Sequence, residues 1–222
     1  NGIWVAVSNE GLYLLSADGT SSRHWSVQNV PNMPNSFTAV LNPDPSTVLL
    51  GTFVQGLWQM KEGKFLPLTK EINMVFDIQP AKEENCFWIS TIGKGFFYYN
   101  LSTGEYLNYK GDHSTTEESR ILGNPYVYAT LLVGDKLFVG TSDGLTVCFP
   151  EKNGVIQKPS EKLLTGNSVR YMALSDDGTF VWVATNNGLV KVDGQSLDIR
   201  EFTTTDGLPV NSIASLCVDG CE

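Results

Sequence analysis

The sequence predicts an all-β chain folded as a β-propeller of five four-stranded blades. Three observations support this prediction: a unit that recurs five times, strand-forming residues throughout each unit, and turn residues along the whole chain. The 222 residues include 21 Gly and 10 Pro, and 11% are aromatic whereas only 18% are charged. This composition is typical of many short strands joined by tight turns.

The recurring unit is an apolar strand, a short polar turn, and then a glycine followed by an apolar residue. The glycines are Gly11, Gly56, Gly95, Gly144 and Gly188. Successive glycines are 45, 39, 49 and 44 residues apart, which is the length of a four-stranded propeller blade. We expect a single domain, 1–222, with blade repeats near 1–47, 48–86, 87–136, 137–180 and 181–222.

Each part of the unit has its own strand signal. The strand before the repeat glycine is apolar, at residues 3–7, 48–52, 87–91, 137–141 and 181–185. After the glycine, an alternating strand such as 189–192 leads into a turn of Asp, Gly and Ser, which tolerate positive φ. A shorter and more polar strand, such as 199–202, then suits the outer edge of a sheet, because polar edges discourage pairing with other chains.

An asparagine opens the last strand of every unit: Asn35, Asn73, Asn124, Asn167 and Asn211. Asparagine caps turns and accepts backbone donors there. The strands that follow are apolar on both faces, which predicts the innermost position between neighbouring sheets. The chain starts on a second strand, at 3–7, and ends on an innermost one, at 213–218. Those ends either pair to close a five-bladed ring or belong to a larger, seven-bladed one.

Charge and hydropathy exclude several partners. The chain has 15 Lys+Arg against 24 Asp+Glu, a net charge of −9, and no basic run. Nucleic acids and anionic membrane surfaces are therefore not expected as partners. No stretch approaches the roughly 18 apolar residues of a membrane span, so this segment does not insert directly. The cysteines are too few and too irregularly spaced for a disulfide framework or a zinc site.

The units resemble the two-component regulator propeller repeat. The fifth unit matches best, because residues 181–189 read VWVATNNGL and residues 205–213 read TDGLPVNSI. The similarity covers the whole chain and is weaker in unit two, where Leu49 replaces the tryptophan, and in unit four, where Phe138 does so. The resemblance implies the periplasmic sensor region of a hybrid two-component histidine kinase, responding to oligosaccharides from polysaccharide breakdown. Neighbouring domains of the same receptor, and a possible homodimer, would be its partners.

No catalytic residues, cofactor or metal site are predicted. The kinase motifs are absent, and His24 and His113 lie near no nucleophile pattern. The paired carboxylates 83–84, 117–118 and 176–177 are interpreted as solvated loops, and residues 175–179 as a hairpin turn. No calcium loop with alternating acidic ligands occurs.

Ligand binding is predicted on the loops that lead into the innermost strands. The candidates are Arg170, Tyr126, Tyr128, Asn124, Asn167, Thr38 and Asn211. Aromatic rings offer apolar faces to sugar C–H groups, and Arg and Asn offer directional donors. The sequence leaves two roles open for Arg170: it either contacts a ligand or forms a structural salt bridge. Phe76 and Tyr171 are interpreted as core between blades.

Three functions follow from these observations. The first is a ligand-sensing propeller. The second is a scaffold or dimerisation propeller of the same receptor that binds no ligand. The third is a glycan-active enzyme, a lyase or glycosidase, although the carboxylates show no pairing that would suit hydrolysis.

Overall fold

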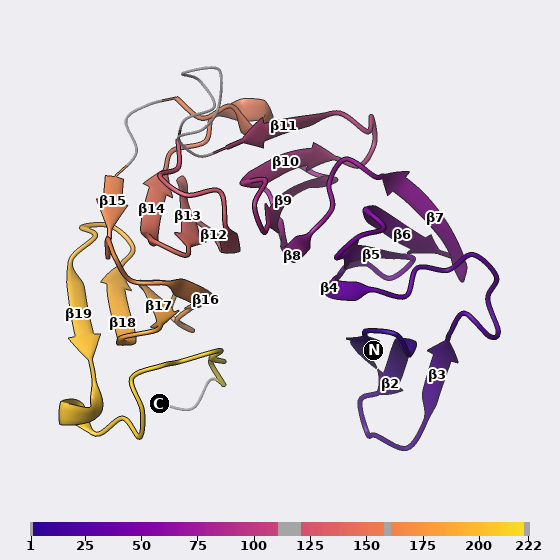
Figure 1. Ribbon diagram of the computed structural model, residues 1–222, viewed down its shortest axis with the longest axis horizontal. Coiled ribbons are helices and arrows are strands. Elements are labelled where there is room, and N and C mark those ends of the chain that lie inside the picture. The colour runs from indigo at the N-terminus through magenta and orange to yellow at the C-terminus, as the bar shows by residue number, and fades with distance from the viewer. Residues whose placement is uncertain (1, 111–120, 158–160, 220–222) are drawn as a thin grey trace.

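The computed structural model describes residues 2–110, 121–157 and 161–219. They form five antiparallel sheets that follow one another around a central space, as an open ring (Figure 1). Sheet one has three strands: β1 (Gly2–Val7), β2 (Gly11–Ser16) and β3 (Ser22–Trp25). The other four sheets have four strands each, and in every sheet the strands are ordered as they occur in the sequence.

The four-stranded sheets run from the central space outwards. Sheet two contains β4 (Phe37–Asp44), β5 (Thr47–Thr52), β6 (Leu57–Lys61) and β7 (Lys64–Thr69). Sheet three contains β8 (Val75–Pro80), β9 (Cys86–Thr91), β10 (Phe96–Asn100) and β11 (Tyr106–Tyr109). Sheet four contains β12 (Val127–Val133), β13 (Lys136–Thr141), β14 (Gly144–Cys148) and β15 (Glu161–Leu163). Sheet five contains β16 (Val169–Leu174), β17 (Phe180–Thr185), β18 (Gly188–Asp193) and β19 (Ile199–Phe202). Single turns of 3₁₀ helix occur at η2 (Lys152–Gly154) and η3 (Thr204–Asp206).

The predicted all-β fold of repeated four-stranded sheets is confirmed, with one exception at the last innermost strand. Residues 213–218 form no strand; the backbone N–H of Ile213 donates to the carbonyl of Thr185 at 2.9 Å, and the segment then leaves the sheet. The innermost strands of sheets two to five each pair with the strand that follows them in sequence. No strand follows residue 218 in the described part of the chain, so residues 213–218 lack such a partner. Across residues 2–110, 121–157 and 161–219, no strand pairs with the inner edge of β1. The five-bladed ring is therefore not closed in this structure.

A buried threonine ends the second strand in four of the five sheets. The hydroxyls of Thr52, Thr91, Thr141 and Thr185 donate to the carbonyl of the following repeat glycine, at 2.7, 2.7, 3.0 and 2.8 Å. In sheet one the same position is Val7. The hydroxyl closes the tight loop to the third strand, which explains why threonine recurs before the glycine.

Both the backbone conformation and the lack of space require glycine at the repeat position. Gly95 has φ +76°, and a Cβ there would lie 1.9 Å from the carbonyl oxygen of Tyr109 on the outermost strand. An L-residue is disfavoured at positive φ, and the neighbouring strand leaves no room for a side chain. The glycine therefore lets the outer strand approach the start of the third strand.

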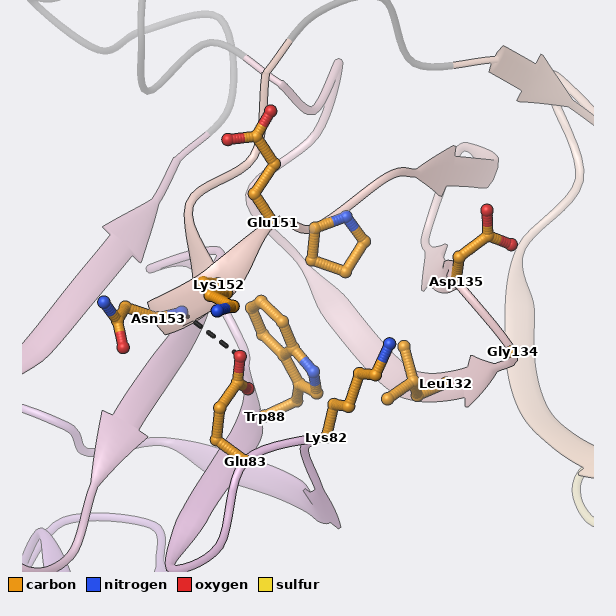
Figure 2. A pocket seen from close by; sticks show the side chains of 10 residues that line it. Lys82, Glu83, Trp88, Leu132, Gly134, Asp135, Glu151, Lys152 and Asn153 are labelled. Carbon is orange, nitrogen blue, oxygen red and sulfur yellow. Dashed lines mark hydrogen bonds between the residues drawn. The ribbon is translucent and has the colours of Figure 1, made fainter.

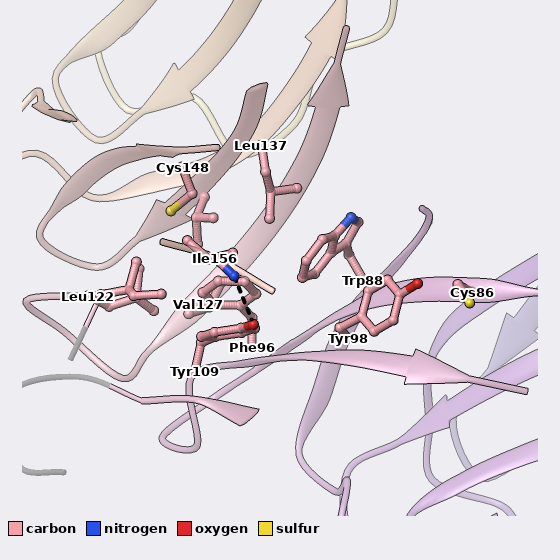
Figure 3. Close-up of a cluster of buried hydrophobic side chains, with 12 residues drawn as sticks. Cys86, Trp88, Phe96, Tyr98, Tyr109, Leu122, Val127, Leu137, Cys148 and Ile156 are labelled. Carbon is pink, nitrogen blue, oxygen red and sulfur yellow. Dashed lines mark hydrogen bonds between the residues drawn. The ribbon is translucent and has the colours of Figure 1, made fainter. Parts of the chain in front are cut away.

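The core lies between adjacent sheets. Trp88 is 1% exposed in the cluster between sheets three and four (Figure 3). In the cluster between sheets one and two, Trp4 stacks on Trp25 with ring centroids 5.5 Å apart, and Trp58 is partly buried nearby. Each core cluster thus lies between two sheets that follow one another in the sequence.

Residues 149–157, which we call the strap, run from the end of β14 back onto sheet three. Gly154 lies flat on the ring of Tyr98, where a Cβ would be 2.2 Å from the ring carbon Cγ. The Tyr109 hydroxyl donates to the Gly154 carbonyl at 2.6 Å. The same hydroxyl accepts from the backbone N–H of Ile156 at 3.2 Å (Figure 3). Burial raises the pKa of Tyr109 to about 12. The strap therefore connects the end of β14 in sheet four to sheet three.

Candidate functional site: an aromatic face at the start of the innermost strands

The predicted binding loops lie at the end of the ring where the innermost strands begin. Each innermost strand starts with a β-bulge, because pairing skips one residue between its first and third positions. The skipped residues are Thr38, Phe76, Tyr128 and Arg170. A bulge redirects a side chain out of the strand alternation, so these four occupy one special position in each unit.

Aromatic side chains are exposed at this end of the ring. Phe53, Phe76, Tyr126 and Tyr171 are 44%, 42%, 46% and 39% exposed. The rings of Phe76 and Tyr128 meet edge to face, with centroids 5.3 Å apart and planes at 70°. We define the aromatic face as these five aromatic residues and Arg170: Phe53, Phe76, Tyr126, Tyr128, Tyr171 and Arg170. The interpretation of Phe76 and Tyr171 as core between blades is wrong, because the bulges turn these strand starts out of the apolar alternation.

Backbone hydrogen bonds hold the loops of sheets two, three and four together at this face. Phe53 donates to the carbonyl of Ser36, and Met74 donates to the carbonyl of Phe53, at 2.9 and 2.8 Å. Ile92 then donates to Met74 at 2.9 Å and forms an isolated bridge with Tyr126. The aromatic side chains are therefore carried on mutually bonded loops rather than on independent turns.

Arg170 is exposed at the start of β16. Among the residues that the structure describes, Lys136 and Asp135 form an ion pair at 3.9 Å, and Arg170 forms no ion pair. Of the two roles left open by the sequence, the salt bridge therefore has no partner in the described chain. The guanidinium is free to bind a ligand from solvent.

Two of the asparagines before the innermost strands use their side chains to bind the backbone of the chain. The Asn124 side-chain oxygen accepts from the backbone N–H of Tyr126 at 2.9 Å, and that of Asn211 accepts from Thr204 at 2.8 Å. Asn124 also lines a small cavity of about 70 Å³. Asn167 is half-buried and its backbone N–H donates to the carbonyl of Leu164 at 3.0 Å.

Phe53 and Val54 belong to this surface although the sequence analysis missed them. They occupy the polar turn of the second unit, where the other units carry residues such as Ser142 and Asp143. Val54 is 66% exposed. Two consecutive apolar residues in this turn, which no other unit has, were the signal available in the sequence.

Two Asp-containing turns share one geometry, at the end of the ring opposite the aromatic face. Asp177 accepts from the Ser175 hydroxyl at 2.7 Å, the Thr179 backbone at 3.0 Å and the Thr179 hydroxyl at 2.8 Å. These bonds, the Ser175 hydroxyl first, lower the pKa of Asp177 to about 2. Asp18 has the same arrangement with Ser16 and Thr20. The predicted hairpin turn at 175–179 is thus confirmed.

Among the described residues, the remaining polar side chains form no assembled reaction centre. His24 stacks on Tyr13 with centroids 4.1 Å apart, and its Nε2 lies 3.2 Å from the carbonyl of Glu10. His113 and the carboxylates at 117–118 lie outside the described residues. Within the described ranges there is no group of three or more His, Cys, Asp or Glu able to hold a metal ion. In the same ranges, no helix has the length and apolarity needed to cross a bilayer.

The fold and the aromatic face define a β-propeller segment with a surface suited to ligand or protein contact. No protein-family model and no curated protein matches this sequence. Among solved structures, the extracellular domain of BT4673 from B. thetaiotaomicron, described as a hybrid two-component system, shares 19% identity with a TM-score of 0.68, over 90% of this chain and 26% of that chain. The corresponding BT3049 domain from the same organism shares 18% with a TM-score of 0.71, over 96% and 28%. The computationally designed Ika8 protein shares 14% with a TM-score of 0.61, over 99% and 75%.

This chain thus spans about a quarter of the two bacterial domains. At such low identities the comparisons establish the shared fold, and the function has to be argued from the site.

Proposed function

We propose that this chain is a ligand-sensing propeller segment of an extracytoplasmic, periplasmic receptor region of a hybrid two-component system. In this proposal it binds polysaccharide-derived oligosaccharides and passes the signal through neighbouring domains to a kinase elsewhere in the receptor. The aromatic face is the observation that carries the proposal. The fold shared with extracellular domains of hybrid two-component systems supports the same receptor class.

The chemistry of the aromatic face suits a sugar. Phe76 and Tyr126 expose ring surface that can pack against the C–H groups of a pyranose, while the Tyr126 hydroxyl and Arg170 supply hydrogen bonds to its hydroxyls. Because the loops are already bonded to each other, little ordering is required on binding. Thr38 and Asn167, near the same strand starts, provide further polar groups.

Isothermal titration against a panel of oligosaccharides tests the proposal. Arg170→Ala and Tyr126→Ala are each expected to weaken binding by about tenfold, as loss of a charged or aromatic contact does. Arg23→Ala, an exposed arginine on the outer strand of sheet one, is the matched control and should bind as the wild type does. The absence of any heat with every oligosaccharide in the panel would refute sugar recognition by this segment.

A scaffold or dimerisation role is the second candidate, because an exposed patch containing Phe53 and Val54 also fits a protein contact. Analytical ultracentrifugation of the wild type and of Val54→Ser distinguishes the two. A concentration-dependent dimer that Val54→Ser dissociates would favour this role. A monomer that still binds an oligosaccharide would exclude it. A lyase or glycosidase role is third, and a turnover assay on acidic and neutral glycans tests it.

A further inference from the structure

A cavity of about 400 Å³ lies at the end of the ring opposite the aromatic face, between sheets three and four. Figure 2 shows its lining, which comes from the two hairpins that follow β8 and β12 and from the strap. Its walls include the charged residues Lys82, Glu83, Asp135, Glu151 and Lys152. Cavities of roughly 300–1,000 Å³ accommodate small-molecule ligands in proteins.

One residue that lines this cavity, Trp88, has a hydrogen-bond donor without an acceptor. Trp88 is 1% exposed, and its indole Nε1 is buried with no partner in the described part of the chain. The nitrogen edge of the indole faces Lys82 and Leu132 in Figure 2. An indole N–H can only donate, so whatever satisfies it must bring an acceptor oxygen. An unsatisfied buried donor is uncommon in folded proteins and calls for an explanation.

In the described ranges, the two lysines of the lining form no ion pair with its three carboxylates, those of Glu83, Asp135 and Glu151. Both oxygens of Glu83 are already used, by the Tyr98 hydroxyl at 3.1 Å and the Asn153 backbone N–H at 3.2 Å. The Glu151 carboxylate points away from the indole in Figure 2. Within the described ranges neither Lys82 nor Lys152 takes part in an ion pair.

We propose that this cavity binds a small organic carboxylate. The carboxylate oxygens would accept from the Trp88 indole N–H and from the ammonium groups of Lys82 and Lys152, and the organic part would contact Leu132 and Pro150. Charge-assisted hydrogen bonds of this kind are stronger than neutral ones. The apolar wall favours an organic acid over an inorganic anion. Aromatic acids and sugar acids share this chemistry, and the site is independent of the proposed function of the aromatic face.

The indole N–H of Trp88 provides a direct readout. The chain has five tryptophans, and a ¹H–¹⁵N spectrum shows one indole signal for each; Trp88→Phe identifies that of Trp88. Addition of benzoate, or of glucuronate in a second arm, is expected to move this signal downfield and leave the other four unchanged. Benzyl alcohol and glucose are the neutral counterparts and should have no effect. The arm that responds identifies the kind of acid.

Lysine variants separate binding from packing. Lys82→Met and Lys152→Met are each expected to weaken binding of the responding acid by about tenfold. Both side chains are exposed, so the variants should fold. Lys64→Met, at an exposed position on β7, is the matched control and should bind as the wild type does. No downfield movement up to roughly 10 mM acid, or an equal response to the neutral counterparts, would overturn the proposal. Loss of oligosaccharide binding at the aromatic face would leave this result unchanged, so the two proposals fail separately.

Discussion

The hydroxyl of Thr91 donates a hydrogen bond of 2.7 Å to the carbonyl oxygen of Gly95, and both residues are buried. The same carbonyl accepts from the Thr91 backbone N–H at 3.0 Å. One residue therefore contributes two bonds to one loop. Because three other sheets have the same side-chain hydrogen bond, the bond is a regular feature of the repeat.

Replacing Thr91 by valine should lower the free energy of unfolding by about 1 kcal/mol, the usual contribution of one such hydrogen bond. Valine has nearly the same shape, and Val7 already occupies this position in sheet one. Urea unfolding measures the change. Thr91→Ser keeps the hydroxyl and should restore most of the lost stability, whereas a valine variant as stable as the wild type would show that the bond contributes nothing.

Gly93 and Gly95 form a matched pair for testing the repeat glycine. Both have positive φ, +91° and +76°, but a Cβ at Gly93 meets nothing within 4 Å, whereas at Gly95 it meets the Tyr109 carbonyl. Gly93→Ala should cost about 1 kcal/mol from backbone strain alone. Gly95→Ala should cost on the order of 3 kcal/mol or more, because the outer strand must also move. Thermal unfolding compares the two, and equal costs would contradict the steric argument.

The strap should loosen when the Tyr109 hydroxyl is removed. Tyr109→Phe leaves the Ile156 amide and the Gly154 carbonyl without their partner, at a cost of about 1–3 kcal/mol for buried groups. Hydrogen exchange at Ile156 should become faster. Tyr106→Phe, on the same strand but 41% exposed, is the control and should leave that exchange rate unchanged. Unaltered protection of Ile156 in Tyr109→Phe would mean that the strap is held by other contacts.

The Asp177 turn should weaken in acid. The pKa of this carboxyl is about 2 in the folded chain, below its usual 3.8, because Ser175 and Thr179 donate to the ionised form. A folded-state pKa below the unfolded value means that the stabilisation is complete above about pH 4 and is lost as the pH falls towards 2. Asp177→Asn should therefore be less stable than the wild type at pH 6 and nearly equal to it at pH 2. Asp176→Asn, at the exposed neighbour that accepts none of these bonds, is the control. A stability difference that is constant from pH 6 to 2 would contradict the shifted ionisation.

The sequence was sufficient to predict the repeated sheets, because the repeat glycine and the strand alternation are local signals. It was not sufficient for the orientation of Phe76 and Tyr171, since one bulged residue reverses the alternation on which the burial argument depends. The expected strand at 213–218 required a pairing partner that the local pattern cannot supply. The candidate residues Tyr126 and Arg170 were predicted from their position in the repeat, and the structure places both at exposed positions. The cavity beside Trp88 could not be predicted in this way, because it arises from contacts between distant segments.

The strap affects how the chain unfolds. Sheets are assembled from consecutive hairpins, and in such arrays each unit depends mainly on its nearest neighbours. The Tyr109 hydroxyl, however, joins sheet three to residues 45 and 47 positions later in the chain, beyond the third strand of the next sheet. Opening sheet four therefore removes part of the cover of sheet three. Sheets three and four should form one cooperative unit of local unfolding, in contrast to sheet one, which can fray at its unpaired edge without disturbing them.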